Sequence, residues 1–140
     1  MSLAAVLLPV FVQIALTFAL MLSMGAARRS ALKSRAVAMR DIALGQNVWP
    51  QKVLQIGNAF HNQLETPVLV YVAVALSLAS VKPDLIFVCL EWLFVAGRLA
   101  HAYVHTGSND VRLRGPVFAI GFLALGAMWI EFATRALMAG

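Results

Sequence analysis

The chain has 140 residues, of which 61% are hydrophobic and only 12% charged, and its formal net charge is +5 at pH 7. This composition excludes a separate water-soluble core and predicts a single integral membrane domain over residues 1–140. The basic excess does not indicate nucleic-acid binding, because the lysines and arginines cluster in loops beside apolar segments.

The first predicted membrane span covers residues 3–24, in which Gln13 is the only strongly polar side chain. A span needs roughly 20 mostly apolar residues, and this segment has them. Its basic residues follow the apolar run and do not precede it. The segment is therefore expected to remain as a span and not to be a cleaved signal peptide.

The first loop, residues 25–51, is strongly basic and contains one acid, Asp41. Its basic side chains are Arg28, Arg29, Lys33, Arg35 and Arg40. Because cytoplasmic loops are rich in lysine and arginine, this loop is expected in the cytoplasm and both termini outside it. Residues 26–39 are a candidate for a short surface helix.

The second predicted span covers residues 51–80 and has a polar stripe in its first half: Asn58, His61, Asn62 and Glu65. At about 100° per residue, the two asparagines and the glutamate fall within about 60°, with the histidine at the edge. A carboxylate facing lipid costs at least a few kcal/mol, so the stripe is expected to face protein or a wet cavity. The alternative is that it only bonds neighbouring helices. Pro67 should bend the helix.

The third predicted span, residues 85–105, carries a second polar stripe: Arg98, His101 and His105. Glu91 lies on the same face two turns further out. Because the second and third spans run in opposite directions, the two stripes are expected to converge in the cytoplasmic half. Cys89, the only cysteine, is expected to be a buried and inert thiol.

Glu65 is expected to be buried beside a basic side chain, because an ionised carboxylate at that depth must be paired or solvated. Arg98 is the first candidate, since it is the only arginine well within the third span. The alternative is that Arg98 forms a purely structural ion pair with Glu65 or Glu91.

The third loop, residues 106–115, carries Arg112 and Arg114 and is expected in the cytoplasm by the same rule. The fourth span covers residues 116–138, where the i, i+4 spacing of Glu131 and Arg135 predicts a structural pair, within the helix or between subunits. Small residues of this span offer surfaces for close helix packing: Gly121, Ala124, Gly126 and Ala127.

The cytoplasmic half thus collects a carboxylate, amides, histidines and arginines, an assortment that suits a small zwitterionic ligand. Arginine binds carboxylates through forked hydrogen bonds, and a carboxylate receives an ammonium group. A cationic side chain can also hold a bound thiol as the nucleophilic thiolate.

Three motifs follow one another along the chain: Ala27-Arg28-Arg29, then Asn58-x-x-x-Asn62-x-x-Glu65, then Arg98-Leu99-Ala100-His101 before a basic loop. In order and spacing they resemble the MAPEG family, the membrane-associated proteins in eicosanoid and glutathione metabolism. The resemblance covers nearly the whole chain. It implies an all-α integral membrane protein, a bundle of four transmembrane helices that assembles as a homotrimer. A bacterial-type member would be a multi-pass protein of the inner membrane.

The resemblance further implies a glutathione-dependent transferase or peroxidase that acts on a hydrophobic electrophile or lipid. Glutathione would lie between subunits, bound by Arg28, Arg29, Asn58, Asn62, Glu65, Arg98, His101 and His105. Glu65 would meet its amino group, and Arg112 or Arg114 would stabilise its thiolate. The implied partners are membrane lipid and a hydrophobic small molecule, with no nucleic acid and no metal.

Two positions depart from the pattern of glutathione-using members. Asn58 stands where an arginine usually opens the motif of the second span, and His105 stands where a tyrosine is usual. An amide cannot replace a guanidinium group as a carboxylate clamp. Two other interpretations stay open. One is a catalytically silent membrane protein of the same fold. The other is a metal site formed by His61, Glu65, His101 and His105, because helical His-x-x-x-Glu and His-x-x-x-His spacings place two metal ligands on one face.

Overall fold

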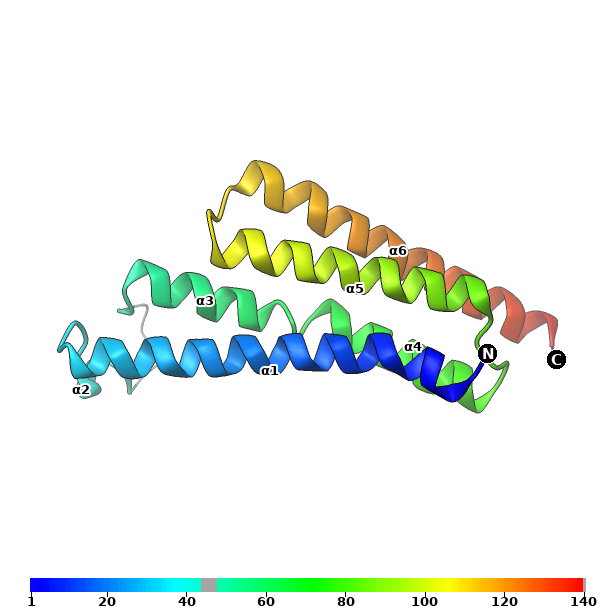
Figure 1. Ribbon diagram of the computed structural model, residues 1–140, viewed down its shortest axis with the longest axis horizontal. Coiled ribbons are helices and arrows are strands. Elements are labelled where there is room, and N and C mark those ends of the chain that lie inside the picture. The colour runs from blue at the N-terminus through cyan, green and yellow to red at the C-terminus, as the bar shows by residue number, and fades with distance from the viewer. Residues whose placement is uncertain (44–47, 140) are drawn as a thin grey trace.

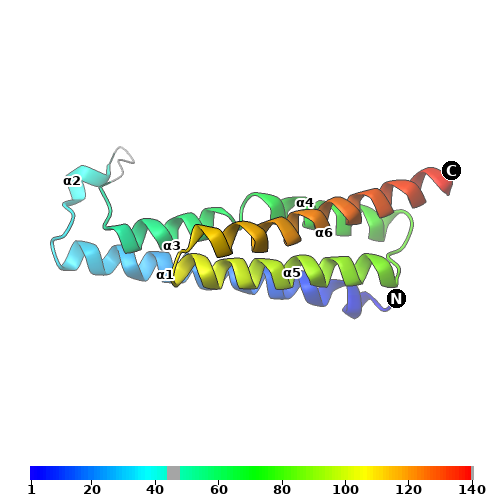
Figure 2. The same cartoon turned by 90° about the horizontal axis from the view of Figure 1, so that it is seen from above.

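The computed structural model describes residues 1–43 and 48–139. These residues form six helices and no strand: α1 (Leu3–Lys33), α2 (Met39–Ile42), α3 (Gln51–His61), α4 (Thr66–Ala79), α5 (Leu85–Thr106) and α6 (Val111–Met138). Helices α3 and α4 follow one path, so four helical segments are long and apolar enough to cross a membrane. The predicted all-α bundle of four transmembrane helices is confirmed. Both termini lie at the same end of the bundle (Figures 1 and 2).

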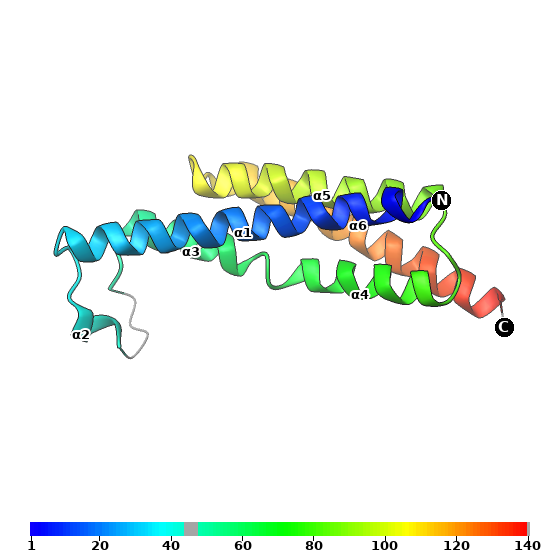
Figure 3. The same ribbon diagram turned by 60° about the horizontal axis from the view of Figure 1, so that its bottom comes forward.

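Helix α1 is longer than the predicted first span. It begins after Ser2, whose side chain accepts a hydrogen bond from the Ala5 amide at 3.2 Å, and it continues without interruption to Lys33. Figures 1 and 3 show its far end projecting beyond α5. The expected separate helix over residues 26–39 is therefore wrong. The alanine, leucine and basic residues after Gly25 are good helix formers that extend the span.

The second span is broken between α3 and α4. Helix α3 closes at Asn62, whose amide donates to the Asn58 carbonyl at 3.1 Å, and α4 begins at Thr66 (Figure 3). Pro67 lies in the first turn of α4, where its missing N–H breaks no helical hydrogen bond. In a continuous helix its ring would clash with the carbonyl of residue 63. The predicted bend is therefore a break that lies just before the proline.

Helices α5 and α6 pack closely through glycines. A Cβ atom added to Gly97 would lie 3.3 Å from Gly121 Cα, so a larger residue would push the helices apart. Side chains of four helices form an apolar core in the half of the bundle that carries the termini: Val6, Val70, Ala73, Val74, Phe87, Val88, Phe94, Val95, Ala124, Leu125 and Met128. Cys89 is exposed on α5, so its predicted burial is wrong. Apolar surroundings in a membrane span do not separate lipid-facing from protein-facing positions.

Arg135 bonds several groups at the end of the bundle where both termini lie. Its guanidinium group lies 3.1 Å from a Glu131 carboxylate oxygen and 3.3 Å from one of Asp84. It also donates to the carbonyls of Val81 and Lys82 at 3.1 and 3.0 Å. The predicted Glu131–Arg135 pair is thus confirmed within α6, and it also holds the turn between α4 and α5.

Candidate functional site

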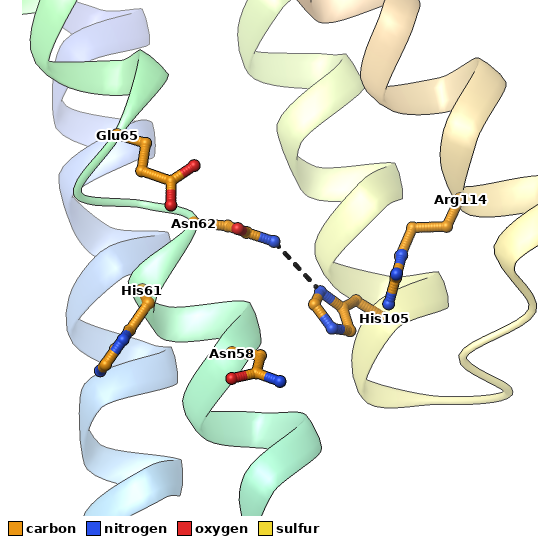
Figure 4. A pocket seen from close by; sticks show the side chains of 6 residues that line it. All are labelled: Asn58, His61, Asn62, Glu65, His105 and Arg114. Carbon is orange, nitrogen blue, oxygen red and sulfur yellow. Dashed lines mark hydrogen bonds between the residues drawn. The ribbon is translucent and has the colours of Figure 1, made fainter.

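A cavity of about 360 Å³ opens between the α3–α4 break, the last turn of α5 and the first turn of α6. Its lining is polar throughout: Asn58, His61, Asn62, Glu65, His105 and Arg114. In Figure 4, Asn58, Asn62 and Glu65 form one wall, His105 and Arg114 stand on the other, and the His61 side chain turns away from them. The first polar stripe of the sequence therefore meets the end of the second stripe here, at His105.

Side chains at the start of α3 hold the two walls together. The Gln55 amide donates to the carbonyls of His105 and Gly107 at 2.6 and 3.0 Å, and the Lys52 ammonium group donates to the Thr106 carbonyl. The last carbonyls of a helix have no partners within the helix, so these bonds satisfy groups that α5 leaves open. They also fix the end of α5 against α3, which sets the width of the cavity.

Asn62 joins the walls directly. Its side-chain nitrogen lies 3.3 Å from His105 Nδ1 (Figure 4). Its main-chain carbonyl, released by the helix break, accepts a hydrogen bond from Arg98 Nη2. Asn62 therefore connects the break in the second span to two residues of α5.

Arg98 lies behind the cavity wall and is 2% exposed. Its guanidinium group stands 5.7 Å from the centre of the Phe118 ring, and its Nε and Nη1 atoms have no hydrogen-bond partner among the described residues. Removing a guanidinium group from water without a carboxylate partner is costly. The buried arginine therefore has bonding capacity that the folded chain leaves unused.

The expected burial of Glu65 is wrong for the single chain. Glu65 is exposed, and among the described residues no ion pair within 4.0 Å joins it to Arg98. The helix break is the reason. Glu65 lies in the irregular connection at the cavity mouth, while the carbonyl that the break exposes at Asn62 takes up the guanidinium group.

His101, like Arg98, is not part of the cavity lining. It is 3% exposed, its ring centre lies 5.5 Å from that of His105, and it stands equally far from Phe118. Over residues 1–43 and 48–139, no group of three or more histidine, cysteine, aspartate or glutamate side chains is arranged to hold a metal. The metal set of His61, Glu65, His101 and His105 does not assemble in this chain.

The four loop arginines proposed from sequence lie in different surroundings. Arg28 packs between α1 and α3, with its guanidinium group 5.2 Å from the centre of the Trp49 ring, whereas Arg29 is exposed. Arg112 is also exposed. Arg114 lines the cavity, and its Nη1 atom donates to Asn109 Oδ1 at 2.5 Å. Of the two arginines considered for the thiolate, only Arg114 borders the cavity.

The sequence analysis missed an amide pair beside the break. Gln13 of α1 donates to Gln63 Oε1 at 3.0 Å, and Gln63 Nε2 donates to the Ala59 carbonyl at 3.0 Å. Both glutamines are buried. Gln13 was visible as the one strongly polar side chain of the first span, but its partner lies outside the stripe that the ideal helix predicts.

The comparisons with known proteins agree with this architecture. A model described as the MAPEG family matches residues 6–134, a range that contains every residue of the cavity lining. Comparison with curated proteins and with solved structures gave no match.

Proposed function

The chain belongs to the MAPEG family, and from this premise we propose that its cavity binds glutathione for a transferase or peroxidase reaction on a hydrophobic electrophile or lipid. The family is generally associated with glutathione. The observation that supports the proposal most is that the carboxylate Glu65 and the cation Arg114 stand on opposite walls of a polar cavity. Glutathione is a zwitterion whose charges such a pair complements.

Glu65 and Arg114 would bind different groups of glutathione. Glu65 would accept hydrogen bonds from the glutathione ammonium group, in the charge-assisted form that is the stronger kind. Arg114 would favour the thiolate over the thiol, because a neighbouring cation stabilises the anion. The thiolate sulfur would then bond to an electrophilic carbon, and the displaced group would leave with its electron pair.

We propose that a homotrimer completes the site. Glutathione has two carboxylates besides its thiol, whereas the cavity of one chain offers a single arginine, Arg114. Glu65 is exposed at the cavity mouth, where a neighbouring subunit would cover it. The basic first and third loops support a site in the cytoplasmic half, with both termini outside the cytoplasm, as in an inner-membrane protein of bacterial type.

Calorimetric titration of the purified protein with glutathione tests the proposal. Glu65→Gln keeps the shape and removes the charge, so we expect about 10- to 100-fold weaker binding, in line with about 1.5–3 kcal/mol for a hydrogen bond to a charged group. Glu131→Gln is the matched control, because Glu131 pairs with Arg135 far from the cavity. Equal affinity of wild type and Glu65→Gln, or no binding by the folded wild type, would overturn the proposal.

A catalytically silent membrane protein of the same fold is the second candidate. Asn58 favours it, because this amide lines the cavity where glutathione-using members usually carry an arginine. Glutathione binding without turnover of any model electrophile or hydroperoxide would support this candidate.

A further inference from the structure

His105 is the one buried residue among the six that line the cavity. It is 4% exposed, although it lines the cavity. The Gln55 amide fixes its main-chain carbonyl at 2.6 Å, and the ring of His101 packs edge-on against its own at 5.5 Å. Its ring therefore presents a fixed edge to any bound molecule.

Asn62 determines which ring nitrogen of His105 carries the proton. The Asn62 side-chain nitrogen can only donate a hydrogen bond, so His105 Nδ1, at 3.3 Å, must accept it. A neutral imidazole that accepts at Nδ1 carries its proton on Nε2. The bond thus leaves Nε2–H as the donor that remains for a ligand.

Asn62 itself is anchored and keeps this arrangement. Its main-chain amide donates to the Asn58 carbonyl at 3.1 Å, and its carbonyl accepts from the buried Arg98. The second anchor arises because α3 ends at this residue and leaves its carbonyl without a helical partner. The helix break is thereby coupled to the protonation pattern of His105.

We propose that His105 Nε2–H donates a hydrogen bond to the sulfur of the bound thiolate, and that Asn62 is the positioning residue that keeps the proton on Nε2. The proposal rests on glutathione binding in this cavity. Arg114 and His105 stand on the same wall (Figure 4). The positive charge of Arg114 would stabilise the thiolate, and the neutral imidazole of His105 would direct one hydrogen bond to its sulfur. When the thiolate forms, its proton leaves to solvent and the imidazole keeps its own.

Three variants separate this role from a structural one. His105→Phe keeps a ring and removes the donor. His105→Gln places an amide N–H near the position of Nε2, and Asn62→Asp replaces the donor to Nδ1 by an acceptor, which draws the ring proton to Nδ1. Tyr103→Phe is the matched control, because Tyr103 is 81% exposed on the same helix.

The readouts are the ultraviolet absorbance of bound thiolate, the calorimetric affinity for glutathione, and kcat with a model electrophile at saturating glutathione. We expect His105→Phe and Asn62→Asp to lose thiolate absorbance and about 10²-fold in kcat, with His105→Phe changing affinity less than about threefold. His105→Gln should recover most of both signals, and Tyr103→Phe should match wild type.

Two results would overturn the inference in distinguishable ways. If folded wild type binds no glutathione, the proposed function fails and this role fails with it. If wild type binds glutathione and forms the thiolate, but His105→Phe and Asn62→Asp both equal wild type in thiolate absorbance and kcat, the donor role alone is wrong.

Discussion

Charged side chains are bonded differently at the two ends of the bundle. At the end where both termini lie, Arg135 contacts the carboxylates of Glu131 and Asp84 and two main-chain carbonyls. At the end that holds the cavity, Arg114 donates to a single amide, and Arg98 bonds one carbonyl while two of its nitrogens lack partners among the described residues. The hydrogen-bond donors of Arg135 thus find partners within its own chain, whereas Arg98 and Arg114 have fewer partners among the described residues.

This difference separates a structural role from a binding role. A charge in a membrane protein must be paired, solvated or bound to a ligand, because lipid offers it no partner. The pairing of Arg135 is complete without any ligand, so folding alone accounts for it. Arg114 borders the cavity, and in the proposed function the thiolate of glutathione would accept hydrogen bonds from it.

The largest expected effect comes from removing the charge that borders the cavity. Arg114→Met should lower kcat for conjugation by about 10²-fold, because an oriented donor to a developing anion contributes about that much. The free energy of unfolding should change by less than about 1 kcal/mol, since the folded chain gives Arg114 only one side-chain partner. Single-turnover kinetics and thermal unfolding measure the two quantities.

Arg112→Met is the matched control for this variant. Arg112 lies two residues away on the same turn of α6 but is exposed and outside the cavity lining. It should keep wild-type kinetics. Equal losses in the two variants would show that the general positive charge of the loop matters and not the position of Arg114.

Substitution of Arg135 should lower stability and leave glutathione binding unchanged, the reverse of what is expected for Arg114. Arg135→Met removes two ion contacts and two hydrogen bonds to carbonyls, so we expect the free energy of unfolding to fall by about 1–2 kcal/mol, allowing for its partial exposure. Glutathione affinity should equal that of wild type. A loss of affinity without a loss of stability would break the proposed division between the two ends.

Glu91 sharpens the comparison because it lies unpaired among apolar residues of the third span. It is 0% exposed, and over the described residues neither carboxylate oxygen has a hydrogen-bond partner. Burying such a group is unfavourable, so Glu91→Leu should leave thermal stability unchanged or raise it by about 1 kcal/mol. A loss of about 2 kcal/mol or more, with the oligomer intact, would show that Glu91 has a structural partner in the assembly.

Helical periodicity predicted the fold and part of the cavity from sequence. Apolar run lengths gave the four spans, and the spacing in the second and third spans brought Asn62 and His105 to facing walls. The sequence did not predict that the break before Pro67 leaves Glu65 exposed and, among the described residues, without an ion pair to Arg98, because helical periodicity assumes a continuous second span. It also did not separate Arg112 from Arg114, because both were assigned to the predicted loop over residues 106–115, whereas both lie in α6, which begins at Val111.

The most direct test of the central claim is an experimental structure of the protein in lipid nanodiscs at saturating glutathione. We predict glutathione in the cavity, with its ammonium group at Glu65 and its sulfur within hydrogen-bond distance of Arg114 and His105. An empty cavity at saturation, or glutathione bound with its sulfur away from both residues, would contradict the account.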